Sequence, residues 1–434
     1  MIQKIKKIEI SEGFNLHLIK SDKFKTDLIG MYIKRPLREN DASKNALIAR
    51  LLERGSFKYK TAQKLNERLD ELYGAILVND VHKYGEKHIF QFKLQVPDQN
   101  YVLSDNIFEN AIDTLNEVIM NPLVEDGGFK EEYVEQEKKN LIQTIKSKKN
   151  DKVTYALEQC IEKMCPDEPF RISQNGSIEN VKKIDRVELY KYYKEIFSNA
   201  PIDLCVIGDI DFDYTEKIIR KKINFDRKEI IQIKRENINK DILKVNEYVE
   251  NMKVNQSKLT LGYRTNISYE DDLYEASVLF TTILGGGANS KLFKNIREEK
   301  SLAYYIYAKL EKYKSIMLIT SGINGENKEE VKRLIKENIK NIQDGKISKN
   351  EINIAKKSIV ASIQSRSDYP NTFINYYYSQ DLINKDIKTD TLIEKYKNIS
   401  KEEIIKVSKK LVLDTIHFID KVEKGENDEK WKNI

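Results

Sequence analysis

The stretch LGGGANSKLFKNIREEKSLAYYIY, residues 284–307, contains the pattern from which the fold can be predicted. Three consecutive glycines open it, and such a run commonly ends a helix or allows a close backbone approach. A period of about 3.6 residues follows and predicts a short helix, which Asn289 or Ser290 can cap. The period then changes to two, with Tyr304 and Ile306 on one face, which predicts a strand. Helix and strand succeed each other directly, which favours an α+β class.

Length and composition indicate a globular chain with more than one domain. Its 434 residues exceed a single typical core, and 40% hydrophobic with 33% charged residues describe a strongly solvated surface. The net charge of +6 comes from 75 basic and 69 acidic residues that are interspersed. Since no basic stripe accompanies this charge, nucleic acid is not an expected partner.

The cellular compartment is predicted from the cysteines and the N-terminus. Cys160, Cys165 and Cys205 form neither a CxxC pair nor an even disulfide set, which indicates a reducing compartment. The first residues, MIQKIKKIEISEGFNL, contain no apolar core of a signal peptide, and no apolar segment reaches the length of a membrane span. We expect a cytoplasmic protein that does not bind membranes.

Two halves of the chain repeat each other. KLNERLDELYGAIL from Lys64 parallels KLFKNIREEKSLAYYIY from Lys291, and a helix capped by Asp185 before a buried strand parallels one capped by Ser400. The offset is about half the chain, which predicts a duplicated α+β unit with an antiparallel sheet packed against helices. The predicted segments are residues 1–225 (first domain), 226–255 (charged linker), 256–424 (second domain) and 425–434 (tail).

This organisation and the GGG…R…AY motif resemble the M16 peptidase family, which includes insulinase and the mitochondrial processing peptidase. The resemblance covers nearly the whole chain and implies two homologous M16-type (LuxS/MPP-like) domains. In that family an Arg and a Tyr seven residues later hold the substrate peptide, and Arg297 and Tyr304 have this spacing. The resemblance therefore implies substrate-binding roles for Arg297 and Tyr304. The glycines Gly285, Gly286 and Gly287 either let the loop approach a peptide or a partner closely, or merely end a helix.

The zinc-binding half of the family's site is missing. Family peptidases carry H-x-x-E-H on an early helix, where two histidines share a face and the Glu activates the zinc-bound water. Counted back from Gly55-Ser56, these three positions are Ala46, Ala49 and Arg50. The region of the family's E-x6-E helix has Glu137 at its first acidic position but Thr144 at the zinc-binding one. The resemblance thus implies no bound zinc, and we expect Arg50 to pair with Glu137 or Glu53.

Other chemistries have weaker support in the sequence. His82, Glu86 and His88 could share one face of an extended segment, although Tyr84-Gly85 predicts an interrupting turn. Cys160 and Cys165 are better explained as buried thiols than as ligands or a nucleophile. The GGGANSK run lacks the GK[ST] end of a phosphate loop, and the four histidines suggest no catalytic triad.

The resemblance leads to one main functional hypothesis. Two-subunit members divide the work between a zinc-carrying chain and a zinc-less chain that supplies the Arg/Tyr side. This chain resembles the zinc-less member of bacterial pairs, of the type associated with elongation factor P modification. It would bind a peptide or unfolded protein beside a partner that carries HxxEH and the zinc. The alternatives are a peptidase-fold adaptor or homodimer without a role in proteolysis, and an active peptidase with unusual ligands.

Overall fold

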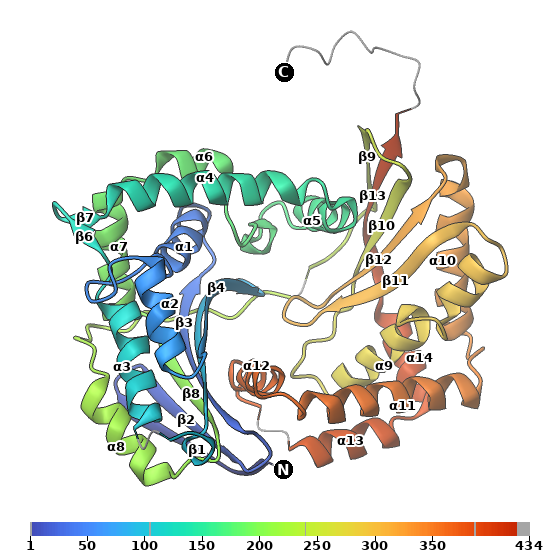
Figure 1. Ribbon diagram of the computed structural model, residues 1–434. Helices are drawn as coiled ribbons and strands as arrows, with labels where there is room; N and C mark the ends of the chain where they lie inside the picture. Colours follow the sequence, from blue (N-terminus) through green and yellow to red (C-terminus); the bar gives the residue numbers. More distant parts are fainter. Residues whose placement is uncertain (1, 104–105, 239, 386–387, 423–434) are drawn as a thin grey trace. The chain divides into compact units, whose positions relative to one another are not determined.

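The computed structural model describes residues 2–103, 106–238, 240–385 and 388–422. The chain forms two compact units, each built on one β-sheet (Figure 1). The first unit comprises Met1–Lys146, Ile172–Arg235 and Gln364–Asp386, and the second unit comprises Ser147–Arg171, Glu236–Ile363 and Ile387–Ile434.

The first unit contains a six-stranded sheet in the order β1-β2-β8-β3-β5-β4. Its strands are β1 (Ile2–Ser11), β2 (Phe14–Ser21), β8 (Ile202–Gly208), β3 (Thr26–Pro36), β5 (Lys87–Pro97) and β4 (Ile76–Tyr84). All neighbouring strands are antiparallel except β2 and β8, which run parallel. Buried apolar side chains alternate along these strands, so the sheet presents an apolar surface on both faces.

One face of this sheet carries the main core of the unit. Met31 and Ile33 of β3 face it, together with Phe90 and Phe92 of β5. The described helices of this unit that surround the core are α1 (Glu39–Leu51), α2 (Ala62–Glu71), α3 (Ile107–Met120), α4 (Glu131–Lys148), α6 (Ile178–Lys183), α7 (Arg186–Asn199) and α8 (Phe212–Lys222). A short hairpin, β6 (Val124–Glu125) with β7 (Gly128–Phe129), and a 3-10 turn η1 (Gln99–Tyr101) complete the connections.

The opposite face of the first sheet is covered by a helix from late in the sequence, α12 (Pro370–Asp381). Phe373, Ile374 and Tyr378 of α12 pack on a smaller apolar cluster of the sheet. The Tyr378 ring stacks on that of Tyr32 with ring centroids 3.9 Å apart. Because Tyr32 lies between Met31 and Ile33 in β3, its side chain points to the other face, as strand geometry requires.

The second unit contains a five-stranded sheet in the order β11-β12-β10-β13-β9. Its strands are β11 (Ala303–Glu311), β12 (Ile316–Ile323), β10 (Ser257–Arg264), β13 (Val412–Lys421) and β9 (Asn246–Met252). Here β13 and β9 run parallel, and the other neighbours are antiparallel.

Helices cover both faces of the second sheet as well. The helices are α9 (Tyr274–Gly285), α10 (Lys328–Gln343), α11 (Lys349–Arg366), α13 (Thr389–Asn398), α14 (Lys401–Lys410) and α5 (Lys152–Met164), with short turns η2 (Pro169–Arg171), η3 (Phe293–Glu298) and η4 (Gly325–Asn327). Helix α9 packs on β11, and α13 and α14 pack against α9. Helix α5 packs on β10 and β13 from the other face, where Cys160 and Met164 contribute to a small apolar cluster.

The predicted duplication is confirmed by the order of elements. The succession β3, α1, α2, β4, β5, α3, α4, α5, α6, α7, β8 recurs as β10, α9, η3, β11, β12, α10, α11, α12, α13, α14, β13. Helices α5 and α12 are therefore equivalent, and each packs on the sheet built mainly by the other half of the sequence. The antiparallel-rich α+β architecture with two similar domains is as predicted.

The two compact units are not simply the two consecutive halves of the sequence, because α5 and α12 each pack with the other half. Sequence periodicity can indicate that a segment is a helix, but it does not tell on which sheet that helix packs. Residues 246–252, placed within a linker, form the edge strand β9 because they pair with β13. The predicted tail 425–434 lies outside the described residues.

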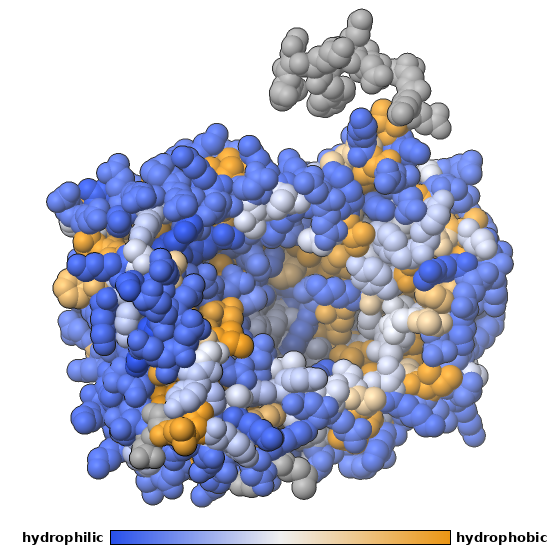
Figure 2. Space-filling model, viewed as in Figure 1, coloured by the Kyte–Doolittle hydropathy of each residue, from blue (hydrophilic) through white to orange (hydrophobic). Residues whose placement is uncertain are grey.

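The surface matches the charged composition. On the face seen in Figure 2, hydrophilic residues predominate and hydrophobic ones are scattered in small groups. Among the described helices, none combines the length and the apolar composition that crossing a bilayer would require.

Candidate functional site

Helix α1 holds the three positions at which the family's HxxEH motif would stand. Ala46 and Ala49 lie on its buried side, with exposed fractions of 3% and 2%. Their methyl groups pack in the core of the first unit and offer no lone pair. Arg50, one residue further on, is partly exposed and directs its guanidinium toward α4.

Arg50 contacts the two positions of α4 that the sequence singled out. Its Nη2 donates a hydrogen bond to Thr144 Oγ1 at 3.1 Å, and its Nη1 lies 3.8 Å from Glu137 Oε2. The predicted pairing of Arg50 with Glu137 is therefore confirmed. Glu53 Oε1 accepts from the backbone N–H of Asn79 at 2.9 Å, and the Arg50 charge acts on this carboxylate without a direct ion pair between them.

A second arginine, Arg54, was missed by sequence reasoning. Its guanidinium forms the closer ion pair with Glu137, whose Oε1 also accepts from Asn140 Nδ2 at 3.0 Å. Arg54 follows Arg50 by four residues, a spacing that could have indicated a shared face had the helix been expected to continue. Glu137 is 5% exposed, so its charge is stabilised by two guanidinium groups within the protein.

These residues do not fit a zinc ion. A family-type site needs three neutral or anionic ligands, whereas this place presents two methyl groups, a hydroxyl, two fixed cations and one carboxylate, Glu137, that both cations already engage. Among the described residues, three possible ligand side chains converge at His17, Asp203 and Asp381, which belong to a different place in the first unit.

The cluster of His17, Asp203 and Asp381 is better explained as a polar attachment of α12. Lys34 Nζ lies 2.7 Å from Asp203, and Lys7 Nζ lies 2.7 Å from Asp381. His17 bonds Asp203 at 3.1 Å and the Tyr377 hydroxyl of α12 at 2.9 Å. Burial alone would raise the pKa of Asp203, but Lys34 and His17 hold it below its usual range. Since each carboxylate already has an ammonium partner, the cluster does not indicate a metal site.

The other candidate metal ligands lie apart. The predicted turn at Tyr84-Gly85 joins β4 to β5, and His82 pairs with Ile89 while Lys83 pairs with His88. His82 and His88 therefore project from opposite faces of the hairpin. Cys160 and Cys165 are buried thiols, as predicted.

The glycine run ends α9 and lies beside β11. A Cβ on Gly285 would stand 2.4 Å from the backbone nitrogen of Ala308, so only glycine fits there. Gly286 is similarly confined by the backbone of Thr282, whereas Gly287 has φ +119° and open space where a Cβ would lie. The Ser290 hydroxyl donates to the Gly287 carbonyl at 2.6 Å and so closes the loop.

The segment that carries Arg297 winds as a π-helical turn, η3. Its wider winding is seen in the hydrogen bond from Glu299 N to Lys294 O, which spans five residues. Ile296 is buried, and Arg297 is exposed with its guanidinium 4.6 Å from the centre of the Phe293 ring. Single π-helical turns are rare and often lie at functional sites.

Two further irregularities separate Arg297 from Tyr304. Ser301 has φ +54°, a left-handed conformation that is unusual for a residue with a side chain. At the start of β11, Ala303 pairs with Ile323 and Tyr305 with Gly322, so Tyr304 is the extra residue of a β-bulge. Tyr304 is consequently 53% exposed, while Ile306 is buried.

The bulge corrects one detail of the strand prediction. Tyr304 and Ile306 were expected on one face, but the extra residue interrupts the alternation. The Tyr304 hydroxyl instead donates to Asn324 Oδ1 at 3.3 Å. The segment thus presents an exposed guanidinium, which can donate to a peptide carbonyl, and an exposed phenol oxygen, which can accept from a peptide N–H.

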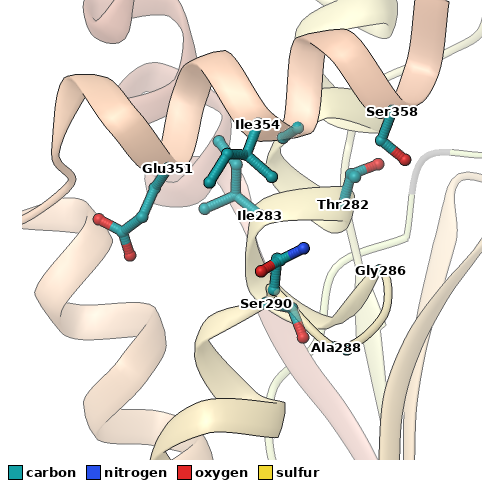
Figure 3. Close-up of a pocket in the computed structure, with 10 residues that line it drawn as sticks. Thr282, Ile283, Gly286, Ala288, Ser290, Glu351, Ile354 and Ser358 are labelled. Atoms are coloured by element: carbon teal, nitrogen blue, oxygen red, sulfur yellow. The ribbon is translucent and has the colours of Figure 1, made fainter. Parts of the chain in front are cut away.

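A small pocket of about 180 Å³ lies between the glycine loop and α11 (Figure 3). Thr282, Ser290 and Glu351 line it, but each already has an internal partner. Thr282 donates to Val278 O, Ser290 to Gly287 O, and Glu351 pairs with Lys291 at 2.7 Å. The pocket therefore gives little indication of a ligand.

Comparison with known proteins identifies the class. A family model described as "Peptidase M16 inactive domain" matches residues 183–359. A protein of Bacillus subtilis named "Probable inactive metalloprotease YmfF" is 31% identical over 408 residues, which cover 94% of this chain and 96% of that one. The chain therefore belongs to the M16 peptidase family and is a homologue of its inactive members.

Solved structures agree with this assignment. A conserved protein from Enterococcus faecalis superimposes with a TM-score of 0.91 at 28% identity, covering 98% of this chain and all (100%) of that one. A protein of Pseudomonas fluorescens, described as a peptidase M16 inactive domain, gives a TM-score of 0.79 at 15% identity over 98% of this chain and 100% of its own. The latter similarity shows the fold alone.

Proposed function

We propose that this chain is the non-catalytic, peptide-binding subunit of a heterodimeric M16-type zinc peptidase. A partner chain with an intact HxxEH motif would hold the zinc, and this chain would supply Arg297 and Tyr304 to bind the substrate. The substrate would be a peptide or an unfolded protein, and the complex would act in the cytoplasm.

The main support is the contrast between the two candidate sites. At α1 and α4 two of the four motif positions are buried alanines, and the other two, Arg50 and Thr144, hydrogen-bond each other. In the segment 293–305 a π-helical turn, a left-handed residue and a bulge occur within a few residues. Left-handed residues also occur elsewhere among the described residues, for example at Tyr73 and Asn266, so the support comes from the combination of three irregularities, which cluster at functional sites. Arg297 and Tyr304 are both exposed within this segment.

The chemistry of these two side chains suits peptide binding. The Arg297 guanidinium donates up to five hydrogen bonds and can stabilise negative charge that develops on a peptide carbonyl, and the Tyr304 oxygen can accept from a peptide N–H. Neither group can activate water without a metal or a base. This chain would therefore bind the peptide, and a zinc-carrying partner would activate the water.

The first experiment identifies the partner. This chain is tagged and isolated from its native host, and co-purifying proteins are examined for an HxxEH sequence. Peptide cleavage is then measured for the reconstituted pair, with and without a chelator. Stable self-association with no HxxEH partner would favour the adaptor or homodimer instead.

The second experiment tests the two residues in the reconstituted pair. We expect Arg297→Ala to lower kcat/KM by about a hundredfold, because the guanidinium would stabilise the reacting carbonyl. Tyr304→Phe should lower kcat/KM by about tenfold, because one hydrogen bond to the peptide backbone is lost. Matched controls are Arg333→Ala on α10 and Tyr248→Phe on β9, both surface positions of the second unit. Equal cleavage by all four variants would remove the proposed role.

A further inference from the structure

The pairing of β11 with β12 places Asn324 beside Tyr304. Ile323 ends β12 and pairs with Ala303, the residue before the bulge. Asn324 follows directly, so the strand pair itself brings its side chain to the phenol of Tyr304. Asn324 is exposed, as is Tyr304.

The backbone around Asn324 is well defined. Its carbonyl accepts from Asn327 N at 3.0 Å as the chain enters the turn η4. A Cβ on the next residue, Gly325, would stand 2.8 Å from Asp420 Oδ1 of β13. The close approach to β13 and the η4 hydrogen bond fix the position of Asn324 relative to the sheet.

The hydrogen bond between the two side chains determines what each can offer a ligand. The Tyr304 hydroxyl donates to Asn324 Oδ1 at 3.3 Å, so its proton is engaged and its oxygen keeps a free lone pair. The carboxamide, oriented by that bond, keeps two N–H donors on Nδ2. The pair therefore presents one acceptor and one donor group side by side.

This arrangement is complementary to the backbone of an extended peptide. In an extended chain the N–H and the C=O of one residue point to the same side, as they do toward a neighbouring antiparallel strand. We propose that Asn324 is a further peptide-binding residue, which donates to a ligand carbonyl while the Tyr304 oxygen accepts from the N–H of the same residue.

The inference rests on the proposed function and specifies its substrate class. Recognition of a backbone unit depends little on side chains, so the ligand would be an unfolded or extended segment of varied sequence. Arg297 remains free to bind a second carbonyl or a carboxylate.

The test uses the full chain and a fluorescein-labelled, unstructured peptide rich in Gly and Ser, with binding followed by fluorescence anisotropy. Asn324→Asp keeps the shape of the side chain but removes both N–H donors, so we expect Kd to rise about fivefold to tenfold. Asn350→Asp, at an exposed position of α11, makes the same chemical change elsewhere and should leave Kd unchanged. The same peptide with N-methylated backbone amides should bind wild type more weakly.

A double-mutant cycle separates this inference from a general effect on the surface. Tyr304→Phe and Asn324→Asp should be non-additive, because the phenol orients the carboxamide. If Arg297→Ala weakens binding and Asn324→Asp does not, the inference about Asn324 is wrong and the proposed function stands. If wild type fails to bind the peptide, or none of these variants changes Kd, both are wrong.

Discussion

Arg50 Nη2 donates a hydrogen bond to Thr144 Oγ1 at 3.1 Å, and this contact joins two positions at which the M16 zinc motif would place ligands. The same guanidinium lies 3.8 Å from Glu137, which also holds Arg54. The place of a metal is thus taken by a network of protein groups that satisfy one another. Restoring a single ligand would leave the other substitutions and both cations in place.

Removal of Glu137 should destabilise the first unit. Without this carboxylate, Arg50 and Arg54 face each other with no anion between them, so we expect Glu137→Ala to cost about 2–3 kcal/mol of unfolding free energy. Glu135→Ala on the same helix removes an exposed carboxylate, paired with Lys138, and should cost well under about 1 kcal/mol. Urea unfolding of both variants measures the two losses of unfolding free energy. Equal losses for Glu137→Ala and Glu135→Ala would show that Glu137 does not hold a stabilising network.

The glycine loop gives a test of close packing within the chain. Gly285→Ala forces a methyl group against the backbone of β11 and should cost about 3 kcal/mol. Gly287→Ala meets open space and should cost only the strain of its positive φ, about 1–2 kcal/mol. Thermal unfolding of the two variants gives the comparison. A larger loss of stability for Gly287→Ala than for Gly285→Ala would contradict the predicted ranking of the two variants.

Asp27 should make stability fall as the pH rises. Burial, with Asp98 and Asp209 nearby, raises the pKa of Asp27 to about 8. The folded state therefore keeps a proton that the unfolded chain loses near its ordinary pKa of about 4, so stability declines between about pH 4 and pH 8. Asp27→Asn should remove this part of the slope and exceed wild type in stability at pH 8. The urea midpoints of wild type and Asp27→Asn, measured from about pH 4 to pH 8, give this slope. Parallel plots of midpoint against pH for the two proteins would contradict the raised pKa of Asp27.

Glu168 should act in the opposite sense at acidic pH. Burial alone would raise its pKa, but Lys314 at 2.6 Å and Arg264 at 3.0 Å lower the pKa to about 2. Its stabilising contribution is present above an ordinary pKa of about 4.5 and is lost as the pH falls toward 2. We expect Glu168→Gln to be less stable than wild type at pH 7 and the difference to shrink with acid. A pH-independent difference would point to a cause other than ionisation.

Much of the fold could be predicted because local rules govern it. Asp185 and Ser400 cap their helices as predicted, since each side chain accepts from backbone N–H groups of the first turn. Periodicity and capping are properties of neighbouring residues. They are therefore visible in a single sequence.

The features that could not be predicted depend on distant pairing. Strand β9 exists because β13 lies beside it, and the bulge at Tyr304 exists because β12 sets the register. The sheet on which α12 packs, and the contact of Tyr304 with Asn324, likewise arise only in the folded chain. The prediction that the zinc ligands are lost needed no structure, since residue identity alone decides whether a side chain can offer a lone pair to zinc.

The most direct test is a peptide-cleavage assay on three samples: this chain alone after removal of loosely held metal, the HxxEH partner alone, and the two mixed. We predict zinc-dependent cleavage by the mixture and none by this chain alone. Chelator-sensitive cleavage by this chain alone, with stoichiometric zinc retained, would contradict the account.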